Sequence, residues 1–399
     1  MVSSELPEAV VEDILSRLPV KSLKRFSCLN KSWYTRFQNS CFIAKHYHHS
    51  SQKNSSILVC GLETLDHDIR KRALSLHPNL DDDNFDSGII LDTPFFTGED
   101  IKLQCIVGAC SNGVICLQAC TRGDYFYSFV LWNPVIREFK VVSPLPVQFP
   151  ANIDYQHTAS GFGYDCNSND FKVVTILTYW DVTGYSLIWD PRVVLNKHVE
   201  VYTLGTDSWR QINCDTISDI HIFGGCCEIY LNGAYHWSGR PKEKDYNIIV
   251  SFDMSNEVFG ILSMPDLNNI SHFNQIWQAL AVLGNCVASV VYNICALEKT
   301  FDIWVMHEYG VKESWTKQYV IGPLSGIRKL VGPANSGHIL LLGDKIFLVE
   351  DNGQVVVYNL NAQQIKNVQV SGHPLYYVTQ AIAYVESLVS IMGRNVIEN

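Results

Sequence analysis

Residues 199–210 have the sequence Val-Glu-Val-Tyr-Thr-Leu-Gly-Thr-Asp-Ser-Trp-Arg, and this short run indicates the architecture of most of the chain. Polar and apolar side chains alternate up to Tyr202, which is the period of a β-strand with one buried face. Tyr202 and Trp209 lie seven positions apart, which fits an antiparallel hairpin with a two-residue loop and two residues on each side. The run therefore predicts a hairpin with two large rings on one face.

This hairpin recurs along the chain. Five β-rich segments carry an aromatic anchor: Trp132, Tyr202, Phe252, Trp304 and Tyr358. The anchors are separated by 70, 50, 52 and 54 residues, and a repeat near 50 residues is typical of β-propeller blades. Four anchors have a large partner seven residues later: Phe139, Trp209, Phe259 and Ile365. For Trp304 the partner is Trp315, eleven residues later, and this odd offset again predicts a pair on one face.

A weaker repeat over residues 57–100 predicts one more blade. The last apolar segments, 376–378 and 381–391, are expected to pair with it, which would close the ring and remove exposed sheet edges. The fold class expected is therefore mainly β, a propeller of about six blades, with a small α-helical N-terminal domain. A ring of five or of seven blades is also compatible with the pattern, because the first repeat is degenerate.

The first 48 residues have a helical pattern instead. Val10, Val11, Ile14, Leu15 and Leu18 recur with the helical period and form one apolar stripe. The residues expected to complete a three-helix unit are Leu23 and Phe26 in a second helix, and Trp33, Phe37, Phe42 and Ile43 in a third. Because so small a unit has little core, the stripe on the first helix packs either on the rest of this chain or on a partner.

A Ser-rich segment at 49–56 is predicted to be a solvated linker between two domains. The charge changes sign there: residues 1–50 carry seven basic and four acidic side chains, whereas the remainder carries 23 and 36. The predicted organisation is a helical domain at 1–48, the linker at 49–56, the propeller at 57–391 and a tail at 392–399.

Composition excludes several classes of protein. The net charge of -10 disfavours nucleic-acid binding, and no apolar run is long enough to predict a membrane helix. The N-terminus lacks the pattern of a secretory signal. Thirteen cysteines, an odd number, favour a reducing compartment, so we expect the protein in the cytoplasm, with the nucleus as a further location.

No motif for catalysis, cofactor binding or metal binding is evident. The spacing of Cys105, Cys110, Cys116 and Cys120 does not match zinc knuckles. His46, His48 and His49 belong to a polar stretch that continues into the Ser-rich segment, is predicted to be solvated and has no second ligand pair nearby. Gly161-Phe162-Gly163 lacks the third glycine and the strand-to-helix context of a dinucleotide loop. The sequence therefore predicts a non-enzymatic protein without cofactor or metal.

Two sets of motifs resemble known families. Leu6-Pro7, Leu18-Pro19-Val20-Lys21-Ser22-Leu23 and Lys31-Ser32-Trp33 resemble an F-box. Leu131-Trp132-Asn133-Pro134, Gly161–Asp165, Asn232-Gly233 with His236-Trp237, and Tyr384–Leu388 resemble the plant F-box-associated β-propeller domain. The resemblance implies the substrate receptor of a Skp–cullin–F-box ubiquitin ligase. The F-box would bind a Skp-family adaptor and, through it, cullin, while the propeller would bind a target for ubiquitination.

Nine residues are the expected adaptor contacts: Leu6, Pro7, Val10, Ile14, Leu15, Leu18, Pro19, Leu23 and Phe26. Target contacts are expected on loops at one propeller face, at about 121–127, 148–156, 178–196, 239–246 and 264–276. The length of the chain and the sequences of these motifs are similar to those of the S-locus F-box subgroup. This resemblance implies a basic pistil ribonuclease as the target, in self-incompatibility. Seven acidic side chains lie within residues 80–100. Either they form a surface that attracts such a partner, or they belong to a solvated loop. Two hypotheses compete with the receptor: a binding hub without a ligase role, and a propeller enzyme.

Overall fold

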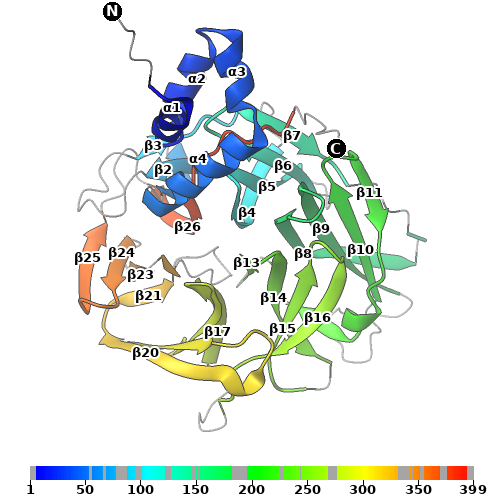
Figure 1. Cartoon of the computed structure of the whole chain (residues 1–399). Coiled ribbons are helices and arrows are strands. Elements are labelled where there is room, and N and C mark those ends of the chain that lie inside the picture. Colours follow the sequence, from blue (N-terminus) through cyan, green and yellow to red (C-terminus); the bar gives the residue numbers. More distant parts are fainter. Residues whose placement is uncertain are drawn as a thin grey trace, which may run out of the picture.

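The computed structural model describes residues 6–53, 56–65, 69–77, 88–95, 101–121, 127–144, 147, 149–150, 152–181, 196–224, 228–242, 244–267, 276–330, 341–342, 345–350, 355–368 and 375–392. Their strands form six antiparallel sheets, arranged around a centre as the blades of a propeller (Figure 1). The helices gather at one edge of this ring. The prediction of a mainly β, six-bladed fold with a helical N-terminal region is confirmed.

The first three blades follow one another from the N-terminal side. Blade 1 contains β26 (Leu375–Tyr384), β1 (Ser56–Leu65), β2 (Ile69–His77) and β3 (Ile89–Ile90). Blade 2 contains β4 (Ile101–Ser111), β5 (Val114–Thr121), β6 (Tyr127–Asn133) and β7 (Glu138–Val142). Blade 3 contains β8 (Ile153–Asp165), β9 (Asp170–Asp181), β10 (Asn196–Thr203) and β11 (Ser208–Gln211).

The other three blades complete the ring. Blade 4 contains β12 (Ile220–Ile222), β13 (Ile229–Leu231), β14 (Ala234–Pro241), β15 (Ile248–Asp253) and β16 (Val258–Ser263). Blade 5 contains β17 (Ile276–Leu283), β18 (Cys286–Asn293), β19 (Lys299–Met306) and β20 (Trp315–Leu324). Blade 6 contains β21 (Ile327–Leu330), β22 (Leu341–Leu342), β23 (Lys345–Glu350), β24 (Val355–Asn359) and β25 (Gln364–Val368). Short 3-10 helices, η1 (Asp215–Ile217) and η3 (Lys312–Ser314), lie in connections.

The last strand pairs with the first, as predicted. In β26, Tyr384 faces Ser56 of β1, and Ile382 faces Leu58. Gln380 of the same strand reaches the neighbouring blade, where its amide bonds both the N–H and the C=O of Ile106, at 2.8 and 2.6 Å. The ring is therefore closed by backbone pairing within blade 1 and by a buried side chain between blades 1 and 2.

The seven-residue hairpin pattern is confirmed in four blades, but the loop is longer than predicted. The facing pairs are Trp132–Phe139, Tyr202–Trp209, Phe252–Phe259 and Tyr358–Ile365. Only one further residue on each side is paired, so each loop has four residues instead of two. The last loop residue has a positive φ in every case: Arg137, Asp207, Glu257 and Gln363. This left-handed residue returns the chain to the sheet.

Trp304 and Trp315 share one face of the sheet, as predicted, but they do not lie directly opposite each other. A register shift between Ile303 and Trp304 places Trp304 opposite Lys317, whose Nζ lies 5.4 Å from the centre of the Trp304 ring. Trp315 faces Met306, and its indole N–H donates to the carbonyl of Ser263 in blade 4 at 2.9 Å. Met306 follows Trp304 by two residues and lies on the same face, so the odd offset predicts the shared face correctly but not the direct partner.

Four helices precede the ring: α1 (Glu8–Leu15), α2 (Val20–Ser27), α3 (Lys31–Phe37) and α4 (Ser40–Lys53). The single third helix predicted from Trp33 to Ile43 is two helices, because the Asn39 side chain accepts from the N–H of Cys41 at 2.9 Å and starts a new one. The linker predicted at 49–56 is helical through Lys53, and β1 begins at Ser56. None of the helices in the described part of the chain is long and apolar enough to span a membrane.

The four helices, which we call the head, share one core with the propeller. Leu15, Val20, Leu23, Phe37 and Phe42 pack with Leu388, which follows β26, and with Val135 and Ile136 of the β6–β7 turn. Trp33 connects the helices as predicted, with its ring edge-on to Phe26 and Phe37 at 5.7 and 5.8 Å. Part of the apolar stripe therefore does pack on the rest of the chain.

Candidate functional site

The head exposes a row of apolar side chains along α1. Leu6, Val10 and Ile14 are 61%, 43% and 48% exposed. Their spacing of four residues places Val10 and Ile14 on one side of the helix, with Leu6 just before its first turn. We call these three residues the α1 stripe. An exposed apolar row of this kind is a candidate surface for contact with a partner.

The other expected adaptor contacts lie at three depths. Pro7 and Pro19 are exposed at the N-caps of α1 and α2. Leu18 and Phe26 are half-buried against the head core, whereas Leu15 and Leu23 lie inside it. The buried pair therefore supports the stripe from behind, and adaptor contact itself stays a prediction for all nine residues.

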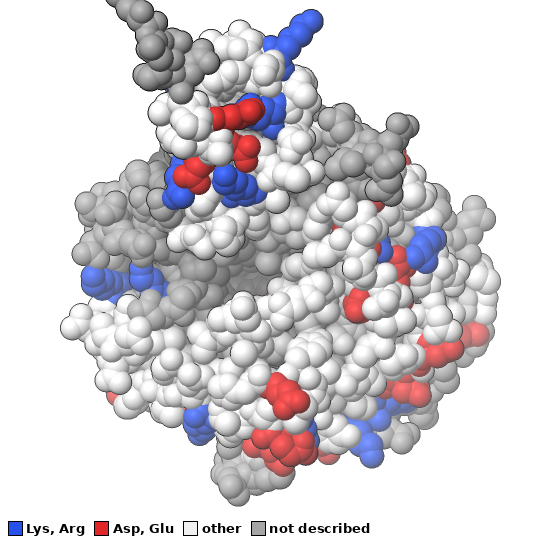
Figure 2. Space-filling model, in the orientation of Figure 1, with Lys and Arg blue, Asp and Glu red and all other residues white. Residues whose placement is uncertain are grey.

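Charged side chains on the head fall into two groups, the acids of α1 with their basic partners and a set of bases without an ion-pair partner. On α1, Glu8 pairs with Arg36, Glu12 with Lys45, and Asp13 with Arg17 at 2.9 Å. The hydrogen bond from Arg17 lowers the pKa of Asp13. Figure 2 shows these red and blue side chains next to one another on the head. By contrast, Lys21, Lys24 and Arg25 of α2, and Lys31 of α3, are exposed and have no ion-pair partner among the residues that the structure describes.

The three histidines of the polar stretch that was predicted to be solvated lie on α4. His46 is 1% exposed, and its Nε2 lies 2.9 Å from the carbonyl of Leu18. His49 faces Asp13 at 3.8 Å, and His48 is exposed. No group of three or more metal-ligating side chains occurs within the described ranges. His46 therefore fixes α4 against the end of the α1 segment.

The two ends of the propeller differ. Because neighbouring strands run antiparallel, alternate connections lie at opposite ends of each blade. The β4–β5 and β6–β7 turns lie at the end that contacts the head, which we call the head end. All five loops expected to contact a target join strands at the opposite end, the far end. Much of 121–127, 178–196 and 264–276 lies outside the described residues, but the strand ends that these loops connect are placed.

The far end has an acidic balance. Its exposed acidic side chains are Asp154, Asp181, Asp215, Asp219, Asp245, Asp266 and Glu298. Its exposed basic side chains are Arg240, Lys242 and Lys244. This comparison covers only side chains whose exposure the structure describes. The acidic run at 80–100 falls outside them apart from Asp92. The far end would therefore attract a basic partner.

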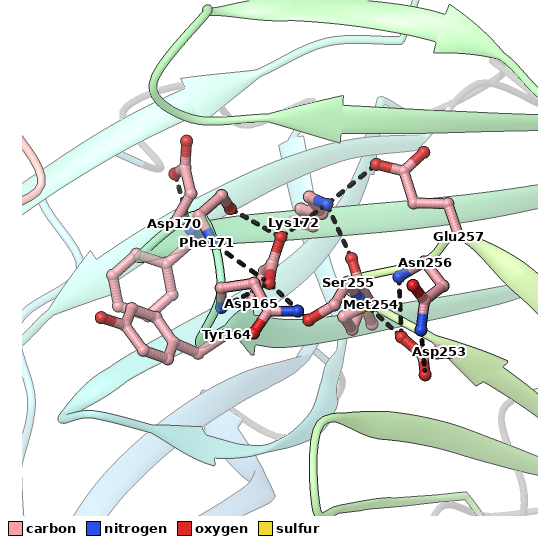
Figure 3. A network of polar contacts seen from close by, with 12 residues as sticks. Tyr164, Asp165, Asp170, Phe171, Lys172, Asp253, Met254, Ser255, Asn256 and Glu257 are labelled. Atoms are coloured by element: carbon pink, nitrogen blue, oxygen red, sulfur yellow. Dashed lines mark hydrogen bonds and ion pairs between the residues drawn. The ribbon is translucent and has the colours of Figure 1, made fainter.

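A buried ion-pair network joins blades 3 and 4 at the head end (Figure 3). Lys172 Nζ lies 2.8 Å from Asp165 Oδ2 and 2.8 Å from Glu257 Oε1, and it donates to the carbonyl of Met254 at 2.6 Å. Burial raises the pKa of Asp165, but bonds from Lys172, Ser168 and Ser255 outweigh it and lower the pKa overall. Each charge has a partner of opposite sign, so the network is a structural tie between blades.

Histidine burial makes the propeller sensitive to acid. His236 is fully buried, and its Nε2 lies 2.7 Å from the hydroxyl of Tyr309 in blade 5. Burial lowers the pKa of His236 to about 4. The unfolded pKa is about 6.5, so the stability from neutral His236 is complete above that pH and is lost as the pH falls toward 4. We expect the free energy of unfolding to fall by about 3 kcal/mol from this group across that range.

Urea unfolding at pH 7, 6 and 5 measures this slope. His236→Gln cannot be protonated, so its unfolding free energy should depend less steeply on pH than that of the wild type. Equal slopes for the two proteins would contradict the assignment. His157, whose pKa burial also lowers to about 4, remains in both proteins and contributes the residual slope.

Comparison with known proteins supports the two-part organisation. The F-box domain matches residues 3–45, and the F-box associated beta propeller domain matches residues 95–391. F-box protein CPR1 of Arabidopsis thaliana is 25% identical over 407 residues, which cover 96% of this chain and 88% of that protein. A putative F-box/kelch-repeat protein of the same plant is 26% identical over a region that covers 100% of this chain and 95% of that protein. The chain belongs to the F-box proteins with an F-box-associated β-propeller domain.

Proposed function

We propose that this chain is the substrate receptor of a Skp–cullin–F-box ubiquitin ligase. The observation that carries the proposal is the exposed α1 stripe on an F-box head whose core, which contains Leu15 and Leu23, is shared with the propeller. The head docks on a Skp-family adaptor, which connects to cullin, and the far end of the propeller binds the target.

Catalysis by such a receptor is positional. It holds a target lysine near ubiquitin that is carried by another subunit, and the gain is an effective concentration. No side chain of this chain needs to touch the reacting bond. The buried histidines and the Lys172 network have structural partners, which agrees with a non-catalytic role.

The stripe alone gives a modest adaptor affinity. Leu6, Val10 and Ile14 are about half exposed, so burying the exposed part contributes about 2–5 kcal/mol in total, from about 1.5–3 kcal/mol for each fully exposed side chain. Association costs about 4–15 kcal/mol. The half-buried Leu18 and Phe26 must therefore add contact area, and each stripe residue has a large share of the net affinity.

The unpaired bases of α2 and α3 predict the chemistry of the adaptor. We expect an acidic surface on the adaptor and an association rate that falls as salt is raised. Lys24→Glu with Arg25→Glu should slow association by about tenfold at low salt. Surface plasmon resonance at several salt concentrations measures both effects.

Lys242→Glu with Lys244→Glu is the matched control, because it makes the same change in net charge at the far end of the propeller. Its association rate should equal that of the wild type. If both double variants slow association equally, the adaptor responds to total charge, and docking of an acidic surface on α2 is wrong.

For the target, we propose a protein with a basic surface. The acidic balance of the far end supports this, and similarity to the S-locus F-box subgroup leads us to propose a pistil ribonuclease. The test is capture of a purified basic pistil ribonuclease, with lysozyme as a basic control protein. Capture of the ribonuclease alone supports the assignment. Equal capture of both, or of neither, contradicts it.

The eleven cysteines within the described residues are free thiols. Free thiols persist in reducing compartments. We therefore propose the cytoplasm, and also the nucleus, as the location.

A further inference from the structure

The residues after the last strand lie between the propeller and the head. Asn133, at the end of β6, is fully buried, and its side-chain amide donates to the carbonyls of Ser387 and Val389 at 3.0 and 2.9 Å. Two bonds from one side chain fix the path of the segment that follows β26. We call residues 385–392 the brace.

A carboxylate of blade 2 holds the other end of the brace. Glu138 Oε2 accepts from the hydroxyl of Ser390 at 2.6 Å and from the N–H of Ile391 at 2.9 Å. Charge-assisted bonds of this kind are stronger than neutral ones. The brace is therefore tied to both strands of the β6–β7 hairpin.

The β4–β5 turn adds a steric constraint. Gly113 has φ +78°, and a Cβ there would lie 2.2 Å from the Cβ of Ser387. Only a glycine lets the brace approach this turn so closely. Together, the turn and the hairpin give the brace one position on the head end.

The opposite side of the brace belongs to the head. Leu388 packs inside the head core, whereas Ile391 packs in the core between blades 2 and 3. Helix α2 starts after Pro19 and has no side-chain cap of its own. Glu386 lies near this end of α2: burial raises the pKa of its carboxyl group, and the backbone N–H of Val20 partly opposes that rise.

We propose that the brace is a positioning element that holds the F-box head in one orientation on the propeller. This inference rests on the proposed function, because a receptor without catalytic groups acts only through the placement of the target relative to the ligase. A head fixed by Leu388, whose segment is tied down by Asn133 and Glu138, transmits that placement. A freely hinged head would spread the target over many positions and lower the effective concentration.

The brace can be loosened without touching the α1 stripe. Leu388→Ala with Glu138→Gln removes the apolar contact with the head and the charge of the tie. The matched control is Leu360→Ala with Glu313→Gln, which makes the same chemical changes in blade 6 and on η3. Leu388 and Leu360 are buried to a similar extent, at 8% and 6% exposure, so both variants lose a comparable core contact.

Head orientation is measured by single-molecule energy transfer in the full chain. Dyes are attached through unnatural amino acids at Tyr34 on the head and Leu297 on blade 5, both exposed. The wild type and the control should each show one narrow distance distribution. The brace variant should lose it and show a broad distribution, while its affinity for a Skp-family adaptor stays within about twofold of the wild type.

A narrow, unshifted distribution in the brace variant would overturn the proposal. If that variant does not fold, Glu138→Gln alone keeps Leu388 in place, and hydrogen exchange of the α2 amides then reports whether the head has loosened. Unchanged protection would also overturn it. The proposed function fails by a different result, which is that the wild-type chain binds no adaptor whatever its head orientation.

Discussion

Replacing Val10 and Ile14 by aspartate is expected to lower the affinity for a Skp-family adaptor by at least about a hundredfold. Val10 and Ile14 are 43% and 48% exposed, so burying the exposed part contributes about 1–3 kcal/mol. Desolvation of two aspartate carboxylates adds at least about 2 kcal/mol, and the sum corresponds to about two or more orders of magnitude in Kd. Both are exposed in the isolated chain, so the substitutions leave the head core intact. Calorimetric titration of the purified chain with the adaptor measures the loss.

The propeller offers a matched control for this experiment. Val258 and Ile261 on the outer strand β16 are 57% and 50% exposed. Val258→Asp with Ile261→Asp repeats the same two substitutions far from α1, and adaptor affinity should not change. If the α1 variant binds as tightly as this control, the stripe is not the adaptor surface.

Buried head residues are poorer tests of the same interface. Leu15 is 4% exposed and packs in the core that the head shares with Leu388. Leu15→Asp would place an unpaired charge in this core and unfold the head, so lost adaptor binding would have two explanations. The exposed pair avoids this ambiguity.

Lys172→Met is expected to destabilise the propeller by about 3–5 kcal/mol at neutral pH, because it leaves the carboxylates of Asp165 and Glu257 without their shared cation. The Lys172 and Asp165 side chains are only 7% and 3% exposed. Chemical denaturation measures the loss. Lys317→Met is the control: its Nζ lies 2.6 Å from Asp302, but the Lys317 side chain is 40% exposed, so the cost should be below about 1 kcal/mol.

The Lys172 prediction has a pH signature. In the wild type the pKa of Asp165 is lowered, so the stability it contributes is present above its ordinary pKa near 4 and is lost as the pH falls through and below that value. Without Lys172 the Asp165 pKa rises, and protonation relieves the unpaired charge. The difference between wild type and variant should therefore shrink on acidification. An equal cost for both lysine variants at neutral pH would contradict a special role for burial.

Local patterns allowed most of the fold to be predicted. The seven-residue spacing of Tyr202 and Trp209 identified a hairpin, because facing residues in an antiparallel pair share one side of the sheet. The pattern did not reveal the four-residue loops, since positive φ at Asp207 or Glu257 is not marked by glycine. At Trp304 the spacing predicted the shared face but not the direct partner, because Trp304 lies opposite Lys317 and Trp315 lies opposite Met306.

Contacts between distant segments could not be predicted. Helical periodicity gave the apolar residues of α1 but not which of them faced inward, because the packing partner Leu388 lies at the other end of the chain. Asn133 belonged to a recognised motif, yet its bonds to Ser387 and Val389 depend on ring closure. Lys172 appeared only as a charge within a strand, and its partners come from another blade.

Turnover of the proteins that the propeller captures tests the receptor function most directly. Proximity labelling in plant cells would compare the full-length wild type with Val10→Asp/Ile14→Asp, each with and without proteasome inhibition. The full chain is required because head and propeller share a core. We expect a set of proteins that are labelled by both the wild type and the variant. In cells with the wild type these proteins should accumulate only when the proteasome is inhibited. In cells with the variant they should accumulate without the inhibitor. Equal turnover of the labelled proteins with wild type and variant would contradict the ligase role and indicate a binding hub.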